Sequence, residues 1–394
     1  MKLLFDLNSL RPPRSGVGYY TQHLLEGLLE QPDVEAIAGW VGSTVYEGDA
    51  LRALMCDQTS LAKAAQFSKG FTASALRAAR NVPGVYKART LARSFASGSL
   101  RRDFAKRGYL YHETNFIASR YRGPSVVTVH DLSHRRHPEF HPSVAVQYLD
   151  DGLPRTLAQA RVVIADSHYT KKEIHDIYGL PDEKVVTVHL GVETCFQPRS
   201  EEVCSAVLAA LGLKYRGFVL SVCTLQPRKN LRRLVAAYAH LPEALRREFP
   251  LVLIGANGWM NSDLQRDIGP LANAGQIIAP GYVSRADLTR LLSAAAVFAY
   301  PSLYEGFGLP VAEAMASAVP VLTANVTSLP EVSAGAAWEV DPYSVDAIAD
   351  GLARLLEDAA LRESLIAKGL QRAAELTWAA TVEQTRDVYR SVLA

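Results

Sequence analysis

The sequence predicts an α/β protein made of two domains, each with a parallel sheet covered by helices on both faces. The chain has 394 residues, which is enough for two domains, and 48% of them are hydrophobic. Short apolar runs rich in β-branched residues alternate with helical stretches through most of the chain. Alternation of this kind is typical of parallel sheets, and two successive sets of it indicate two such domains in tandem.

The first set of strands lies before residue 192. We expect strands at Lys2–Asn8, Val126–Leu132, Arg161–Asp166 and Lys184–Gly191. The segment Ser15–Tyr20 follows the first strand and opens a helix. Pro198 interrupts the pattern after the fourth strand, so we place a linker near residues 194–204 and domains at 1–198 and 199–376.

The second set repeats the pattern. We expect strands at Phe218–Cys223, Pro250–Gly255, Gln276–Tyr282, Ala296–Pro301 and Ala318–Ala324, with helices at Leu231–Leu241, Ala286–Ala295 and Val311–Ala318. Three helices follow, at Val345–Leu356, Ala360–Glu375 and Trp378–Leu393, the last of which is amphipathic. Ligands of open α/β sheets bind at the carboxyl ends of strands, so we expect the site in the cleft between the two domains.

The composition excludes several classes of protein. No uninterrupted apolar stretch approaches the roughly 20 residues of a membrane span, and the start of the chain breaks too early for a signal peptide. We therefore expect a cytoplasmic protein. The four cysteines form no C-x-x-C pair, so neither a disulfide framework nor a thiolate metal site is indicated.

The segment from Pro301 to Pro320 is where we expect the chemistry. Glu305 leaves a strand at the mouth of a glycine-containing turn, and Glu313 lies in the first turn of the helix that follows. The helix end offers amide groups and positive potential for a phosphate. Both carboxylates can then face hydroxyls near that phosphate, as in a sugar joined to a nucleoside diphosphate. A glutamate that merely complements the helix dipole is the alternative.

Two further segments have the character of phosphate sites. Arg228 and Lys229 lie between the strand Phe218–Cys223 and the next helix, where a planar guanidinium and a point charge can neutralise a diphosphate. Gly16 and Gly18 open the first helix and allow close approach of the backbone to a ligand. They do not form the G-x-G-x-x-G fingerprint, which weakens a nicotinamide interpretation. The alternative for Arg228 and Lys229 is that they are solvated surface cations, and the alternative for Gly16 and Gly18 is a simple tight turn.

His130 ends the strand Val126–Leu132, where polar groups are more often placed for a ligand than for packing. We assign it a place near the reacting sugar, with a structural histidine as the alternative. His134, His137 and His141 follow, but their spacing matches no familiar metal motif. We therefore predict no metal site and no cofactor.

The segment 63–107 holds eleven Lys or Arg residues against one acid, Asp103, with five aromatic residues among them. That composition suits peripheral contact with an anionic membrane or with a phosphorylated lipid. Nucleic acid would explain the charge equally well, and a solvated helical face is the plain alternative.

Together these segments resemble the retaining glycosyltransferases of family 4. The resemblance rests on Pro-Arg-Lys-Asn at 227–230, Pro-Gly-Tyr-Val at 280–283 and the segment that carries Glu305 and Glu313. It implies the GT-B fold: two Rossmann-like domains that face each other across a cleft, with the terminal helix 377–394 crossing back to the first. It also implies that the first domain binds the acceptor and the second the nucleotide sugar, with no nucleic-acid partner.

The resemblance also implies roles for individual residues. Glu305 would contact the transferred sugar, and Glu313 the ribose hydroxyls. Arg228 and Lys229 would bind the diphosphate. The amides of the turn, which are those of Phe307, Gly308 and Leu309, would support sugar and phosphate oxygens. His130 would lie near the anomeric centre. Gly16 and Gly18 match the family's first glycine-rich loop.

The donor and the acceptor follow only from resemblance within the family. The segments 255–259 and 301–308 are similar to bacterial mannosyltransferases that build O-antigen and exopolysaccharide chains. This favours GDP-mannose or a GDP-deoxymannose as the donor, and a glycan on polyprenyl diphosphate at the inner membrane face as the acceptor. A UDP-sugar transferase, a nucleotide-sugar epimerase and a non-catalytic sugar-nucleotide-binding subunit remain the alternatives.

Overall fold

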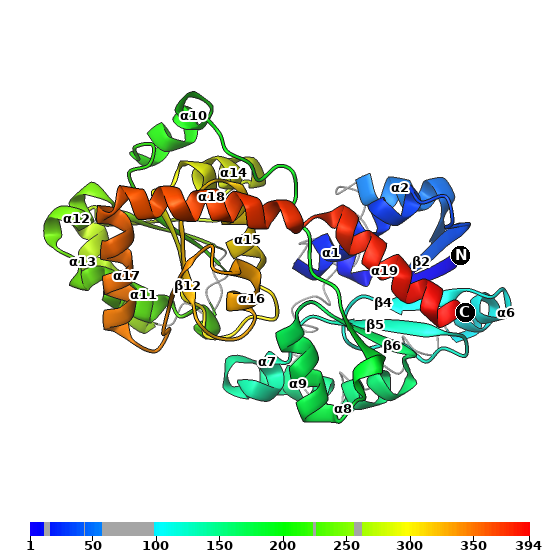
Figure 1. Cartoon of the computed structure of the whole chain (residues 1–394). Coiled ribbons are helices and arrows are strands. Elements are labelled where there is room, and N and C mark those ends of the chain that lie inside the picture. The colour runs from blue at the N-terminus through cyan, green and yellow to red at the C-terminus, as the bar shows by residue number, and fades with distance from the viewer. Residues whose placement is uncertain (12–15, 43, 57–97, 224–225, 256–261) are drawn as a thin grey trace, which may run out of the picture. The chain divides into compact units, whose positions relative to one another are not determined.

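The computed structural model describes residues 1–11, 16–42, 44–56, 98–223, 226–255 and 262–394. They form two compact units (Figure 1). The first consists of Met1–Asp166, Thr170–His189 and Trp378–Ala394, and the second of Ser167–Tyr169 and Leu190–Thr377. The chain passes from one to the other after His189, earlier than the boundary after residue 198 that we predicted.

A seven-stranded sheet forms the centre of the first unit. Its strand order is β3-β2-β1-β4-β5-β6-β7, and all neighbours are parallel except the antiparallel pair β2–β3. The strands are β1 (Lys2–Asp6), β2 (Ala36–Val41), β3 (Thr44–Glu47), β4 (Leu110–Glu113), β5 (Ser125–Val129), β6 (Val162–Ala165) and β7 (Val185–Thr187). Strands β4 and β5 are buried along their whole length, as expected of parallel strands covered on both faces.

Helices cover this sheet. They are α1 (Gly16–Leu29), α2 (Gly48–Cys56), α6 (Gly98–Lys106), α7 (Ser133–Arg136), α8 (Ser143–Gln159), α9 (His168–Tyr178) and α19 (Trp378–Leu393). Single 3₁₀ turns lie at Asn8–Leu10, Pro138–Phe140 and Asp182–Lys184. The apolar faces of α8 and α9 pack on β5, β6 and β7 around Leu153, Leu157 and Ile174, which are all but inaccessible to solvent.

The last helix of the chain, α19, belongs to the first unit and packs beside α1 (Figure 1). The approach is close: a Cβ atom on Gly27 of α1 would lie 2.5 Å from Cγ2 of Val382. Farther along α19, the hydroxyl of Tyr389 lies 2.6 Å from Nδ1 of His112. The chain end therefore returns to the first unit, as the family resemblance implies.

A buried polar network continues from this contact. Nε2 of His112 lies 2.8 Å from the hydroxyl of Thr128, which in turn lies 3.0 Å from the hydroxyl of Tyr20. Burial lowers the pKa of His112 to about 3, so the ring is neutral at every physiological pH. A neutral ring can accept at one nitrogen and donate at the other, which lets this network satisfy its members without a buried charge.

The second unit is built on a six-stranded sheet in which every pair of neighbours is parallel. Its order is β10-β9-β8-β11-β12-β13. The strands are β8 (Val219–Val222), β9 (Leu251–Ile254), β10 (Ile277–Gly281), β11 (Val297–Tyr300), β12 (Val321–Ala324) and β13 (Trp338–Val340). This is the doubly wound order of Rossmann-like domains, with the sheet growing in both directions from its first strand.

Nine helices accompany this sheet in the described part of the unit. They are α10 (Glu201–Leu211), α11 (Leu231–His240), α12 (Glu243–Glu248), α13 (Ser262–Asn273), α14 (Arg285–Ala294), α15 (Leu309–Ala316), α16 (Leu329–Ser333), α17 (Val345–Glu357) and α18 (Ala359–Glu375). A core of fully buried apolar side chains joins α11 and α17 to the strands, including Leu234, Tyr238, Val297 and Leu352.

The strand order fixes where a ligand site can form. In the second unit the chain leaves β8 toward β9 on one side and later places β11 on the other, which makes a topological switch point between β8 and β11. The segments that follow these two strands carry Arg228, Lys229 and Glu305. The predicted fold class is therefore confirmed, and it brings three of the predicted site residues to one edge of one sheet.

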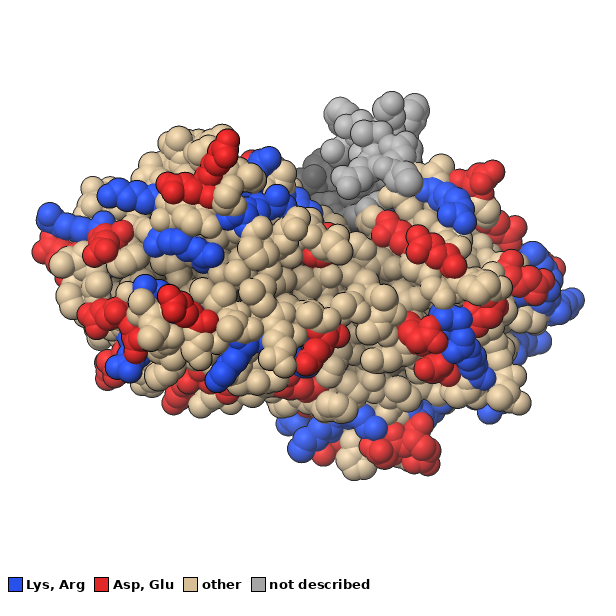
Figure 2. Space-filling view, turned by 45° about the horizontal axis from the view of Figure 1, so that its top comes forward, with Lys and Arg blue, Asp and Glu red and all other residues tan. Residues whose placement is uncertain are grey.

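Charged side chains on the surface are mixed in sign. On the face that Figure 2 shows, groups of Lys and Arg lie interspersed with groups of Asp and Glu. In the part of the chain that the structure describes, no helix is both long enough and apolar enough to cross a membrane. Most of the basic segment 63–107 lies outside the described residues, so the predicted membrane contact stays a prediction.

Candidate functional site

The turn after β11 is a rigid, buried structure. Every residue from Pro301 to Gly308 is buried. Gly308 has a φ of 103°, and a Cβ atom at this position would lie 2.6 Å from Cδ2 of Leu329. Both the backbone conformation and the close approach therefore require glycine here. The hydroxyl of Ser328 holds the turn by donating a hydrogen bond that the carbonyl oxygens of Glu305 and Phe307 share, at 3.0 and 2.8 Å.

The segment after β8 forms the other wall of the switch point. A single 3₁₀ turn, η5 (Pro227–Lys229), carries both cations and ends at Asn230, which has a φ of 60°. The amide of Asn230 donates to the carbonyl oxygens of Pro301 and Pro342 at 3.0 and 2.6 Å. The backbone of Leu303 donates to the carbonyl of Arg228 at 2.8 Å. These bonds join the two segments, so the cations and Glu305 hold fixed relative positions.

Glu305 accepts hydrogen bonds at both carboxylate oxygens. Oε2 lies 3.0 Å from Nη1 of Arg228, and Oε1 lies 2.5 Å from Nζ of Lys229. Oε1 also accepts from the hydroxyls of Tyr300 and Ser302, at 2.9 and 2.6 Å. Lys229 donates in addition to the hydroxyl of Tyr300 at 2.6 Å. The exposed fraction is only 6% for Glu305 and 8% for Lys229, so this ion-pair cluster is almost dry.

The electrostatics of the cluster follow from this geometry. Burial would raise the pKa of Glu305, but the charges of Lys229 and Arg228 outweigh it and lower the pKa to about 2. Burial lowers the pKa of Lys229 and outweighs the raising effect of Glu305. An acid with a pKa near 2 stays ionised at neutral pH, so Glu305 is suited to position groups and to balance charge rather than to transfer a proton.

Glu313 has the opposite environment. It is the fifth residue of α15, so it lies beyond the first helical turn in which we predicted it. It is partly buried, and burial raises its pKa to about 8. Arg285 at the start of α14 lowers this pKa and Glu193 raises it, which places both of these charges near Glu313. Arg285 itself forms an ion pair with Glu193. A neutral carboxyl can both donate and accept, which suits it to bind a pair of sugar hydroxyls.

The peptide groups of the turn are partly engaged within the protein. The carbonyl of Phe307 accepts from Ser328 at 2.8 Å, while the backbone N–H groups of Gly308 and Leu309 donate to no described residue. Gly308 is the N-cap of α15 and Leu309 is its first residue. Two amides at the positive end of a helix can bind an anion, and they belong to the same unit as Arg228 and Lys229.

His130 lies in the first unit, directly after β5, with both ring nitrogens engaged. Nδ1 lies 2.8 Å from Oδ2 of Asp166, and Nε2 lies 2.8 Å from the carbonyl oxygen of Thr114. Burial lowers the pKa of His130, but Asp166, the carbonyl of Thr114 and Asp131 together raise it more, so the net direction is upward. A ring that faces an acceptor at each nitrogen favours the imidazolium form. This geometry suits His130 to an electrostatic role, since neither nitrogen is placed to take up a proton.

Gly16 and Gly18 lie where we predicted, at the start of α1. Gly16 is exposed, and no atom would lie within 4 Å of a Cβ added to it, so the backbone there faces open space. Ser15 and the preceding Arg14 lie outside the described residues, as do Thr224, Leu225 and most of the segment 255–259.

Sequence reasoning missed the polar residues that complete the cluster. Tyr300 ends β11, and its aromatic character is ordinary for a buried strand. Ser302 looks like a turn residue. Both nevertheless contact Glu305. The sequence feature that could have indicated this is their proximity to Glu305, which Tyr300 precedes by five residues and Ser302 by three.

Comparison with known proteins agrees with this geometry. A model of Glycosyltransferase Family 4 matches residues 14–196, and a model of glycosyl transferases group 1 matches residues 210–372. O-antigen chain mannosyltransferase B of Escherichia coli is 34% identical over 390 residues, which cover 99% of this chain and 100% of that protein. This chain belongs to glycosyltransferase family 4. It is therefore a glycosyltransferase. The two family models adjoin near the point where the chain passes from the first unit to the second.

Other family members match over shorter stretches. The serotype-specific mannosyltransferase WbdA of Escherichia coli is 36% identical over 232 residues, which cover 57% of this chain and 28% of that protein. Solved glycosyltransferases confirm the GT-B fold. The structure of Anabaena Alr3699/HepE in complex with UDP-glucose has a TM-score of 0.71 at 17% identity and covers 99% of this chain and 100% of its own. WaaG, a glycosyltransferase of lipopolysaccharide biosynthesis, has a TM-score of 0.62 at 13% identity and covers 98% and 99%.

Proposed function

We propose that this glycosyltransferase transfers mannose, or a deoxymannose such as rhamnose, from a GDP-sugar to a lipid-linked glycan with retention of configuration. The observation that carries the proposal is the buried cluster of Arg228, Lys229 and Glu305 at the switch point of the second unit. The names of the similar mannosyltransferases support the choice of sugar and of an O-antigen type of product.

The cluster is suited to a leaving nucleoside diphosphate. Two cations and one carboxylate leave one net positive charge in a nearly dry site. Negative charge grows on the β-phosphate as the bond to the sugar breaks. Cations and helix-end amides fixed in a low-dielectric site stabilise this charge more in the transition state than in the ground state. Arg228 is the more accessible cation, with 19% of its side chain exposed, and we assign it the direct contact with the diphosphate.

Each carboxylate has a separate part in this proposal. Glu305 holds the cations in place. Its Oε1 already accepts three hydrogen bonds, so Oε2, which accepts one from Arg228, orients hydroxyls of the transferred sugar. Glu313 binds the ribose hydroxyls as a neutral carboxyl. Because the protein supplies the positive charge, we propose that no metal ion is needed, and that the leaving phosphate takes the proton of the acceptor hydroxyl.

Calorimetry of GDP, UDP and ADP with the whole chain, with and without magnesium, tests the donor. We expect binding of GDP that is tighter than that of UDP or ADP and unchanged by magnesium. Preference for UDP or ADP would discard the mannose proposal, and a strict need for magnesium would discard the metal-independent mechanism.

Transfer from GDP-mannose to a polyprenyl-diphosphate-linked glycan, with the detached glycan as a matched acceptor, then tests the reaction. We expect product only with the lipid-linked form, and NMR of its anomeric proton should show retention. Equal transfer to the detached glycan would contradict the lipid-linked part of the proposal. Interconversion of the nucleotide sugar without transfer would instead indicate an epimerase.

A further inference from the structure

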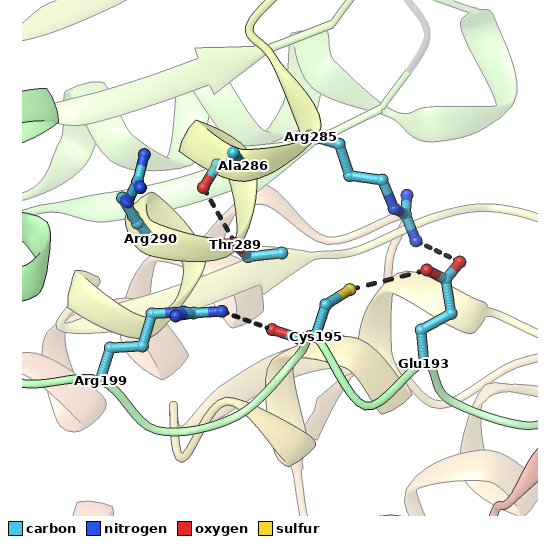
Figure 3. A pocket seen from close by; sticks show the side chains of 7 residues that line it. All are labelled: Glu193, Cys195, Arg199, Arg285, Ala286, Thr289 and Arg290. Carbon is cyan, nitrogen blue, oxygen red and sulfur yellow. Dashed lines mark hydrogen bonds and ion pairs between the residues drawn. The ribbon is translucent and has the colours of Figure 1, made fainter. Parts of the chain in front are cut away.

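A concave site with a different lining from the ion-pair cluster lies in the same unit. It is a pocket of about 370 Å³ between α14 and the segment that precedes α10, lined by Glu193, Cys195, Arg199, Arg285, Ala286, Thr289 and Arg290 (Figure 3). None of these residues belongs to the ion-pair cluster, although Glu193 and Arg285 lie near Glu313 of the predicted donor site. Three of the seven are arginines, and only one is acidic.

Two of the arginines are neutralised by nearby carboxylates. Arg285 forms an ion pair with Glu193, and Nη1 of Arg290 lies 3.1 Å from Oδ1 of Asp287. Arg199 differs from both. Its Nη2 donates to a neutral group, the carbonyl oxygen of Cys195, at 3.0 Å, and no carboxylate of a described residue pairs with it. The positive charge of the pocket therefore remains on Arg199.

The side chain of Arg199 is also held in place with donor capacity left over. Its Nε is buried and has no hydrogen-bond partner among the described residues. Its backbone is fixed on both sides, since its N–H donates to Ser293 Oγ at 2.7 Å and its carbonyl accepts from Tyr215 Oη at 2.7 Å. A buried donor without a partner is costly, and the guanidinium that carries it has no carboxylate partner among the described residues, so its charge is not compensated within the protein.

The positive field extends beyond the pocket wall. Burial raises the pKa of the Cys204 thiol on α10, whereas Arg199, Arg290 and Arg216 each lower it. Three guanidinium charges therefore act on this corner of the unit. The planar guanidinium group matches the oxygens of a phosphate particularly well, because it can donate two parallel hydrogen bonds.

From this arrangement we propose that the pocket binds the phosphate group of a small phosphorylated ligand, with Arg199 as the principal contact and Arg290 beside it. The volume exceeds what a phosphate ion fills, since it corresponds to roughly twelve water molecules at about 30 Å³ each. It falls in the range of about 300–1,000 Å³ that is typical of small-molecule pockets. The carboxylate of Glu193 and the hydroxyl of Thr289 lie in the same lining and can bind hydroxyls, so the space suits a monosaccharide phosphate.

Calorimetry with three probes tests the proposal on the whole chain without nucleotide: mannose 6-phosphate, inorganic phosphate and mannose. We expect mannose 6-phosphate to bind and mannose not to bind. Inorganic phosphate that binds as tightly as the ester would assign the site to the free ion, whereas weaker binding would assign it to the phosphorylated sugar. No binding of either phosphate up to about 10 mM would overturn the proposal.

Variants locate the binding. Arg199→Gln should weaken phosphate binding about tenfold or more, because a charge-assisted hydrogen bond is lost. Arg247→Gln, on the exposed face of α12, is the matched control and should leave binding unchanged. Arg228→Gln separates this pocket from the donor site and should also leave it unchanged. Unaltered binding in Arg199→Gln, or loss in Arg228→Gln alone, would contradict the proposal. If Arg199→Gln melts early, Arg290→Gln gives the same comparison.

Discussion

Replacing Glu305 with glutamine should destabilise the protein strongly while preserving its affinity for nucleoside diphosphate. The carboxylate bonds to Arg228 and Lys229 in a site where little solvent can take its place. Glutamine has nearly the same shape but no charge. The variant therefore keeps the cavity filled and leaves two nearly buried cations without their counter-ion.

The magnitude follows from the pKa of Glu305. A fall from the ordinary value of 4.5 to about 2 corresponds to about 3 kcal/mol of stabilisation of the charged form, at about 1.4 kcal/mol per pH unit. Removal of one partner from a buried ion pair generally costs about 3–5 kcal/mol, in agreement with this value. A depressed carboxyl pKa stabilises the fold fully above pH 4.5, and this stabilisation is lost as the pH falls from 4.5 toward 2.

Urea unfolding of the wild type, Glu305→Gln and Glu357→Gln measures this effect. Glu357 is an exposed acid at the end of α17, which makes it a matched control that should change stability little. Between pH 7 and pH 3, the wild type should lose part of its advantage over Glu305→Gln. GDP should bind the variant at least as tightly as the wild type, because its diphosphate can replace the missing negative charge. A loss below about 1 kcal/mol with GDP binding abolished would refute the reasoning and make Glu305 a donor anchor.

Three further predictions concern other parts of the molecule. Gly308→Ala should lower stability by about 1–3 kcal/mol and weaken GDP binding, because alanine strains the backbone at φ 103° and its Cβ collides with Leu329. Thermal melts and calorimetry measure the two effects, and an unchanged melting temperature would contradict the geometry. Glu313→Gln should stabilise the protein relative to the wild type, and most at pH 8 and above. A carboxyl with a raised pKa stabilises the fold below pH 4.5, and this stabilisation is lost as the pH rises to about 8, whereas glutamine does not titrate. Thermal melts in which the two proteins differ equally at about pH 5 and about pH 9 would argue against it. Tyr389→Phe should cost about 1–3 kcal/mol by leaving Nδ1 of His112 without its partner, and urea unfolding that matches the wild type would show that this bond does not hold α19.

The fold could be predicted well where local apolar pattern decides the structure. The buried strand β11 and the helices α17, α18 and α19 were placed within one or two residues, because each is a continuous apolar or periodic stretch. Strand β4 escaped prediction because half of it is polar: His112 and Glu113 are fully or almost fully buried in the structure. Their burial depends on partners distant in the sequence, such as Thr128 and Tyr389, which no local pattern reveals.

The site could be predicted as a set of residues but not as a network. Strand ends, a glycine turn and two adjacent cations pointed to Arg228, Lys229 and Glu305, because parallel sheets bring such ends together. The sequence gives no sign that the cations bond to Glu305 itself, since more than 70 residues separate them and only the strand order sets the distances. The arginine pocket could not be predicted at all, because Arg199 and Arg290 belong to no motif and meet only through the packing of α14.

Glu305 in the turn and Glu313 on α15 illustrate how surroundings, rather than residue type, decide chemistry. Only eight positions separate Glu305 from Glu313, yet their pKa values of about 2 and about 8 differ by about six pH units. Burial raises both, and the difference arises because two cations bond directly to Glu305, whereas Arg285 near Glu313 is already paired with Glu193. At neutral pH one group is thus an anion and the other a neutral donor and acceptor. In the proposed reaction this combination would suit a nucleotide sugar. Its diphosphate would meet the cations that Glu305 holds in place, and its ribose would meet a neutral carboxyl that adds no negative charge beside the phosphates.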